Sequence, residues 1–207
     1  MTVMDAGIEV VVTRLPPGKD ERELLPLLSA EEQRRADRFV SRSDRRRFIG
    51  RRASLRRLLG ERLNVAPSAI PLSHRARGKP ALSPPFDRSG LEFNLSHCDD
   101  LVLFALSSCG EIGIDVEALR ITPEADRIVA TCFSPGEYEA YSTLPATRRS
   151  LAFLTWWTRK EALAKAVGDG LADARSAPVD NGERSWQIRT FFPAHGFIAA
   201  LAHEAAP

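Results

Sequence analysis

Three carboxylates and two lysines in two short segments have the residue types and spacing to hold a divalent cation beside a phosphate. The first segment, residues 113–117, reads GIDVE, and the second, residues 157–165, reads WTRKEALAK. In a β-strand Asp115 and Glu117 point to the same side, because successive side chains alternate between faces. In an α-helix Glu161 and Lys165 lie one turn apart on one face.

Magnesium chemistry suits such a set. Mg²⁺ prefers hard oxygen ligands in octahedral geometry and takes few of them from the protein, leaving the rest to water and phosphate. Neighbouring lysines would neutralise phosphate charge. The alternative is that both pairs are solvated surface features. An isolated Glu–Lys pair on a helix contributes only about 0.2–0.5 kcal/mol.

A third polar group of residues lies in the segment FNLSH, residues 93–97, before the apolar run 101–106. The pattern predicts that Asn94, Ser96 and His97 occupy a loop joining two strands. A hydroxyl, an imidazole and backbone N–H groups would offer a phosphate several donors there. The alternative is that His97 is only a structural turn residue. Lys79, between Gly78 and Pro80, adds a cation on a predicted turn.

The elements that must position these residues follow from periodicity and from Gly and Pro punctuation. We predict a strand at 8–12, helices at 30–39 and 44–63, strands within 94–106, a strand at 111–116, a helix at 151–167 ended by Gly168, and further C-terminal strands. The order of elements nearly repeats. Two halves are therefore predicted, with a hinge near 107–110.

Taken together, these motifs resemble those of the Sfp-type 4'-phosphopantetheinyl transferases. Four segments carry the resemblance in the family's order and approximate spacing: Gly78-Lys79-Pro80, residues 93–97, residues 113–117, and Trp157-x-x-Lys160-Glu161-Ala162-x-x-Lys165 with Gly168-x-Gly170-Leu171. The resemblance implies an α+β fold of two similar halves related by a pseudo-twofold axis, each a small sheet packed with helices, and an active site in the cleft between them. Residues 1–108 would form the N-terminal half and residues 109–207 the C-terminal half, which carries the metal-binding carboxylates.

The same resemblance implies the reaction. Such an enzyme moves the 4'-phosphopantetheine arm of coenzyme A onto a serine hydroxyl of an apo acyl- or peptidyl-carrier protein, and releases adenosine 3',5'-bisphosphate. It depends on Mg²⁺, with Mn²⁺ as an alternative ion. It serves fatty acid, polyketide or nonribosomal peptide biosynthesis.

The resemblance also assigns roles to individual residues. Asp115, Glu117 and Glu161 match the family's metal ligands. Glu161 is also the position proposed to take the serine proton, and Lys165 the one that stabilises the departing phosphate. The coenzyme A contacts that match are Lys79, Ser96, His97 and Lys160, with Arg35 and Arg38 for the 3'-phosphate of the nucleotide.

An arginine-rich stretch from Arg34 to Arg62 supplies a competing hypothesis. It holds twelve arginines but only three acids, whereas the whole chain has a formal net charge of +2. A nucleic-acid-binding helix is one explanation. Apolar residues recur there at helical spacing, however, so one face should be buried. The nucleotide of coenzyme A and an acidic carrier protein give the arginines alternative uses, and no nucleic acid is expected.

The remaining sequence features fit a cytoplasmic enzyme. The 207 residues, 43% of them hydrophobic, can bury a substantial core as one unit or two small subdomains. The N-terminus lacks a signal-like pattern, and no apolar run is long enough to span a membrane. Three cysteines without C-x-x-C spacing argue against a disulfide framework and a zinc site. A non-catalytic binding module is disfavoured because all the acidic and basic site residues are present. One chain supplies both halves of the cleft, so a monomer is expected.

Overall fold

The structure is a computed structural model, and it describes residues 2–5, 7–15, 21–75, 78–168 and 186–205. Asp169, Gly170 and Leu171 of the last motif lie outside the described residues. The strands are β1 Thr2–Asp5, β2 Ile8–Arg14, β3 Leu72–His74, β4 Pro80–Leu82, β5 Glu92–Cys98, β6 Leu101–Ser107, β7 Ile112–Ala118, β8 Trp186–Phe191 and β9 Phe197–Glu204. The α-helices are α1 Glu21–Leu24, α2 Ala30–Ala36, α3 Arg42–Leu63, α4 Ala125–Cys132, α5 Pro135–Ser142 and α6 Ala146–Val167; two 3₁₀ turns are η1 Leu25–Leu27 and η2 Pro67–Ala69.

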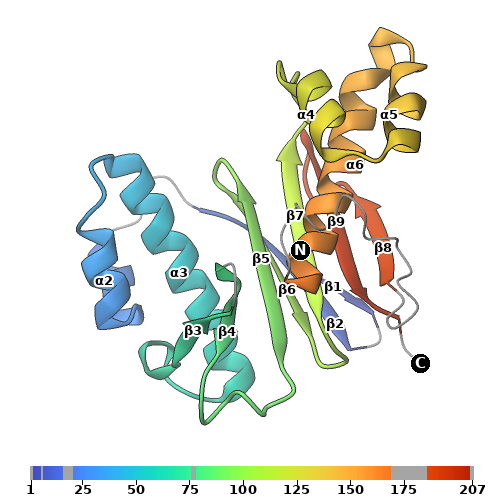
Figure 1. Cartoon of the computed structure of the whole chain (residues 1–207). Helices are drawn as coiled ribbons and strands as arrows, with labels where there is room; N and C mark the ends of the chain where they lie inside the picture. The colour runs from blue at the N-terminus through green and yellow to red at the C-terminus, as the bar shows by residue number, and fades with distance from the viewer. Residues whose placement is uncertain (1, 6, 16–20, 76–77, 169–185, 206–207) are drawn as a thin grey trace.

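Antiparallel strands form a four-stranded sheet, β1-β2-β6-β5, a three-stranded sheet, β7-β9-β8, and the small hairpin β3–β4. The fold class is therefore α+β, as predicted. Strands β5 and β7, which belong to different sheets, lie side by side (Figure 1). The side chain of Asn94 joins them, because its Oδ1 accepts a hydrogen bond from the Ile114 backbone N–H at 3.1 Å.

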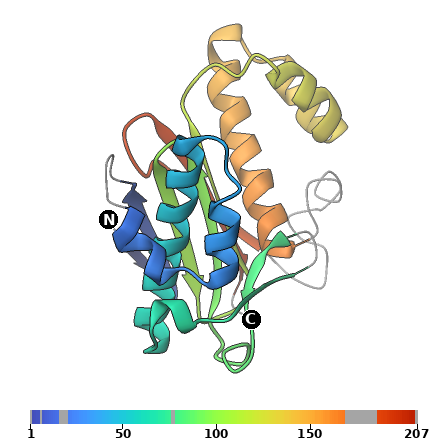
Figure 2. The ribbon, with the colours of Figure 1, turned by 90° about the vertical axis from the view of Figure 1, so that its left-hand side faces the viewer.

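The two 22-residue helices cover different sheets on opposite sides of the molecule (Figure 1). Turned by 90°, the molecule shows α2 and α3 lying in front of the four-stranded sheet (Figure 2). Leu55 and Leu59 of α3 share a buried cluster with Phe93 and Phe104 of that sheet. Burial of such side chains contributes about 1.5–3 kcal/mol each. The predicted apolar face of the arginine-rich stretch is confirmed.

Helix α6 packs directly on the backbone of β7. A Cβ atom at Gly113 would lie 2.0 Å from the carbonyl oxygen of Ala162, so only glycine permits this approach. Ala162, Ala166 and Ala200 continue the contact as small buried residues. The close approach brings the last turns of α6 beside the first residues of β7.

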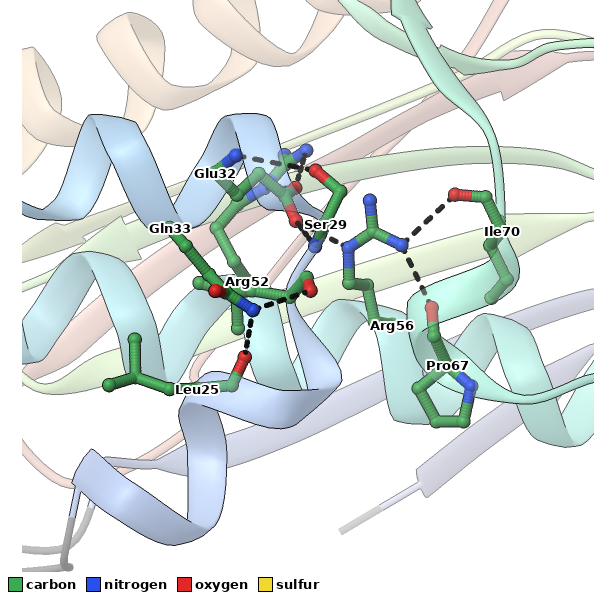
Figure 3. A network of polar contacts seen from close by, with 9 residues as sticks. Leu25, Ser29, Glu32, Gln33, Arg52, Arg56, Pro67 and Ile70 are labelled. Atoms are coloured by element: carbon green, nitrogen blue, oxygen red, sulfur yellow. Dashed lines mark hydrogen bonds and ion pairs between the residues drawn. The ribbon is translucent and has the colours of Figure 1, made fainter.

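Helices α2 and α3 are tied together by a buried ion-pair network centred on Glu32, which we call the Glu32 cluster: Ser29, Glu32, Arg52 and Arg56 (Figure 3). The Arg56 side chain is only 2% exposed and donates from Nε to Glu32 at 2.5 Å. It also donates to the carbonyl oxygens of Pro67 at 2.8 Å and Ile70 at 3.0 Å. Arg56 of the basic stretch is therefore a buried structural residue and is not available to an external ligand.

The predicted loop at 94–97 is wrong. Asn94, Ser96 and His97 lie within β5 and pair with β6, with Asn94 opposite Ala105 and His97 opposite Val102. The turn is at Asp99 and Asp100 instead. Polar residues are stable in this strand because Asn94 and Ser96 face hydrogen-bonding partners on β7.

Some predicted boundaries also differ. Helix α2 ends at Ala36 instead of residue 39, and α6 begins at Ala146 instead of residue 151. Gly168 ends α6 as predicted, in a left-handed conformation with φ of 82°. Across the described ranges, no helix combines the length and apolarity needed to cross a membrane.

Candidate active site

Asp115 lies at the junction of both sheets and α6. Its side chain is buried, and its Oδ1 accepts hydrogen bonds from Ser96 Oγ of β5 at 2.9 Å and from Lys165 Nζ of α6 at 2.7 Å. Lys165 also donates to Ser96 Oγ at 3.2 Å. Three predicted site residues from three different elements therefore form one group, which we call the Asp115 cluster.

The second carboxylate oxygen of Asp115 has no partner among the residues that the structure describes. Oδ2 is buried and forms no hydrogen bond within the described part of the chain. A buried, unsatisfied carboxylate oxygen is costly, and each one in a native structure needs an explanation, such as a bound ion or a functional role. This oxygen is consequently suited to receive a ligand.

Glu117 and Glu161 are half-buried beside Asp115. Burial raises the pKa of each glutamate, and the negative charge of Asp115 adds to the increase. The predicted alternation on β7 and the predicted helical face thus bring three carboxylates within electrostatic reach of one another. Hard carboxylate oxygens that repel one another suit a cation such as Mg²⁺.

These carboxylates do not form an assembled metal site. Among the described residues, no three His, Cys, Asp or Glu side chains are grouped closely enough to hold a metal ion. The assignment of Asp115, Glu117 and Glu161 as metal ligands therefore stays a prediction. The unsatisfied Asp115 oxygen is the observation that favours it.

Positive groups surround His97. Partial enclosure of the imidazole, followed by the charges of Arg51, Lys165 and Arg47, lowers the pKa of His97 from 6.5 to about 4. The ring is thus neutral at neutral pH and can both donate and accept a hydrogen bond. Its side chain nevertheless stays exposed to solvent and to an incoming ligand.

Arg51 lies among other arginines, and the opposing charge of Asp44 compensates it only in part. Burial lowers the pKa of Arg51, and its neighbours Arg47 and Arg35 lower it further. It forms neither a hydrogen bond nor an ion pair with any residue that the structure describes. The sequence places Arg51 only within the basic stretch, because its proximity to His97 depends on how α3 packs against β5.

A groove along α2 extends this positive region. It has a volume of about 670 Å³ and is lined by Glu31, Arg34, Arg35, Arg38 and Phe39. The two arginines predicted to contact the nucleotide lie here. The charge of Arg35 acts on Arg51, and the charges of Arg51 and Lys165 act on His97, so cations lie on both sides of His97.

Two predicted coenzyme A contacts are engaged elsewhere. Lys160 forms an ion pair with Glu137 at 2.9 Å and lies over the Phe133 ring, 5.3 Å from its centroid. Lys79 is buried, not on an open turn, and its Nζ donates to Glu111 and to two backbone carbonyl groups. Neither lysine joins the Asp115 cluster.

Comparison with known proteins identifies the class. Residues 111–204 match the family model of the 4'-phosphopantetheinyl transferase superfamily, and residues 16–109 match that of the 4'-phosphopantetheinyl transferase N-terminal region. The chain is 37% identical over 206 residues to the 4'-phosphopantetheinyl transferase HetI of Nostoc sp., covering 94% of this chain and 87% of that protein. The 4'-phosphopantetheinyl transferase psf-1 of Bacillus pumilus is 31% identical over 177 residues, covering 86% of this chain and 73% of that protein.

The chain therefore belongs to the 4'-phosphopantetheinyl transferase superfamily, as the resemblance of its motifs indicated. It is an enzyme, a 4'-phosphopantetheinyl transferase, and coenzyme A and carrier proteins are the partners that its family implies.

Proposed function

We propose that this enzyme transfers the 4'-phosphopantetheine arm of coenzyme A to a serine hydroxyl of an apo acyl- or peptidyl-carrier protein, with Mg²⁺, and releases adenosine 3',5'-bisphosphate. The observation that carries the proposal is a region rich in arginines beside the Asp115 cluster, with Arg34, Arg35 and Arg38 in the α2 groove and Arg47 and Arg51 acting on His97. A ligand with phosphates at both ends of a nucleotide fits such a region.

Coenzyme A would bind along this region. Arg35 and Arg38 would hold the 3'-phosphate in the α2 groove, since a guanidinium group can give a phosphate two parallel hydrogen bonds. Ser96, His97 and Arg51 would bind the pyrophosphate. Lys160 would approach it from α6 if its ion pair with Glu137 opened.

The carboxylates would act on the reacting groups. Asp115, Glu117 and Glu161 would hold Mg²⁺, which neutralises charge on the pyrophosphate when bound. Glu161 would take the proton from the serine hydroxyl. Its raised pKa makes it a stronger base than an ordinary exposed glutamate. Lys165 would stabilise the negative charge of the departing phosphate.

The organisation of the chain supports a monomer with two related halves, residues 1–108 and 109–207. The two family matches end at residue 109 and begin at residue 111. Ser96 of the first half meets Asp115 and Lys165 of the second, so one chain supplies the whole cluster. A cytoplasmic location accords with the family's substrates.

Nucleic-acid binding is the weaker alternative. Several arginines of the basic stretch are paired inside the protein: Arg52 and Arg56 with Glu32, Arg47 with Asp100, and Arg62 with Glu9. Paired guanidinium groups are less available to a phosphate backbone. This distribution favours coenzyme A and an acidic carrier protein as the partners.

A transfer assay with labelled coenzyme A and a panel of apo carrier proteins tests the proposal. We expect Mg²⁺-dependent labelling of a carrier serine and loss of labelling with excess chelator. Failure to label any carrier, together with micromolar binding of duplex DNA or RNA at physiological salt, would instead support the nucleic-acid alternative.

A further inference from the structure

Lys79 is a buried cation whose hydrogen-bonding capacity is fully used by the protein. Its side chain is 6% exposed. Its Nζ donates to Glu111 Oε2 at 2.7 Å, to the Ile112 carbonyl oxygen at 3.1 Å and to the Ala166 carbonyl oxygen at 3.2 Å. An ammonium group has three N–H donors, so none is left for a phosphate.

The three acceptors lie at the place where α6 meets β7. Ala166 is in the last turn of α6, where backbone carbonyl groups lack intrahelical partners and a cation is favourable. Ile112 is the first residue of β7, three residues before Asp115. Lys79 itself precedes β4 of the small hairpin. Lys79 belongs to neither element, and its hydrogen bonds link the end of α6 to the start of β7.

The position of α6 along β7 determines whether Lys165 reaches Asp115. Lys165 is the direct neighbour of Ala166, whose carbonyl group Lys79 binds. The helix contacts β7 at Gly113, which has no side chain to interlock with the helix and resist sliding. The small residues packed around this contact are not directional, whereas the hydrogen bond from Lys79 to the Ala166 carbonyl group depends on where the end of α6 lies along β7.

The carboxylate of Glu111 offsets the desolvation cost of burying the Lys79 charge. Its Oε1 also accepts from Arg75 at 2.5 Å, and Arg75 donates to Glu92 at 2.7 Å. Two cations and two carboxylates thus balance. Arg75 and Glu92 are more exposed than Lys79, so the buried end of this network is the end that touches α6.

We propose that Lys79 is a positioning residue that holds the C-terminal end of α6 on β7, so that Lys165 lies at hydrogen-bond distance from Asp115. This inference rests on the proposed role of Lys165 in the transfer reaction. It replaces the expectation that Lys79 contacts coenzyme A directly.

Steady-state kinetics of Lys79→Met, Lys165→Met and the double variant test the inference. Displacement of a catalytic group by about 1 Å can reduce rate about a hundredfold, so we expect Lys79→Met to lower kcat by roughly ten- to a hundredfold. The KM for coenzyme A should change less than about threefold. In the Lys165→Met background, Lys79→Met should lower kcat by less than about twofold, because the two substitutions then remove one effect.

Two further variants complete the test. Arg75→Gln opens the exposed end of the network without touching α6 and should keep kcat within about twofold of wild type. Lys79→Gln retains N–H donors and replaces Lys79→Met in the test if the methionine variant does not fold. Its loss in kcat should likewise be non-additive with that of Lys165→Met. Additive losses in kcat, or a large rise in the KM for coenzyme A at unchanged kcat, would overturn the inference. If the wild-type enzyme labelled no carrier, the proposed function would fail instead.

Discussion

The Glu32 cluster and the Asp115 cluster both bury a carboxylate beside cations, but the protein satisfies them to different degrees. Both Glu32 oxygens accept hydrogen bonds: Oε1 from Arg52, and Oε2 from Arg56 and from the Ser29 backbone N–H. Within the described ranges Asp115 uses only Oδ1, and its buried Oδ2 is left without a partner.

The glutamates of the two regions also differ in their pKa values, which are lowered in the Glu32 cluster and raised beside the Asp115 cluster. Burial alone would raise the pKa of Glu32, but Arg52, the Ser29 backbone and Arg56 together hold it below its usual value. Burial and Asp115 raise the pKa values of Glu117 and Glu161 instead. The arginines therefore compensate the charge of Glu32, whereas Lys165 does not offset the burial and mutual repulsion of the carboxylates in and beside the Asp115 cluster. We infer that buried carboxylates with full compensation by hydrogen bonds and cations have a structural role, and that those without it have a functional role.

The largest expected effect is on the stability of the Glu32 cluster. Glu32→Gln leaves Arg56 buried without a carboxylate, and removal of one partner from a buried pair costs about 3–5 kcal/mol. Urea denaturation should show this loss in the free energy of unfolding. Turnover per folded molecule should stay close to wild type at low temperature. A variant that unfolded normally but lost turnover would contradict the comparison.

Asp115→Asn should produce the opposite pattern. Asparagine can still accept the Ser96 hydrogen bond, so the free energy of unfolding should change by less than about 1 kcal/mol. Loss of the carboxylate charge should reduce single-turnover transfer by roughly a hundred- to a thousandfold, the range for removal of one electrostatic group from a reaction site. Transfer at the wild-type rate by the folded variant would remove Asp115 from the site.

Acid should weaken the Glu32 cluster. Because the pKa of Glu32 is lowered on folding, its contribution is present above its ordinary pKa of 4.5 and is lost as pH falls through the lowered value. Each unit of depression corresponds to about 1.4 kcal/mol. The free energy of unfolding of the wild type should therefore fall below pH 4.5 more steeply than that of Glu32→Gln. Parallel pH profiles would show that Glu32 contributes no such stabilisation.

The smallest effect is expected at an exposed ion pair, which serves as a control. Arg62 donates to Glu9 at 2.5 Å, but its side chain is 40% exposed. Arg62→Gln should change the free energy of unfolding by less than about 1 kcal/mol and leave transfer unchanged. A loss as large as that of Glu32→Gln would show that burial does not distinguish the two pairs.

Local sequence patterns were sufficient to predict most of the elements around the site and the residue types that they carry. Alternation on β7 gave Asp115 and Glu117 a common side, helical spacing gave Glu161 and Lys165 a common face, and Gly168 ended the helix. Apolar periodicity in α3 separated a buried face from the solvated arginines. These features depend on neighbours within a few residues, so local rules are sufficient to predict them.

Which charged groups come into contact depends on tertiary packing. Lys165 reaches Asp115 across 50 residues of sequence, and Lys79 reaches the Ala166 carbonyl group across 87. The pairing of β5 with β6 overturned the predicted loop at 94–97 and placed Ser96 against Asp115. Such contacts depend on the packing of separate sheets and helices, in which a small displacement exchanges one partner for another, and no local pattern encodes that displacement.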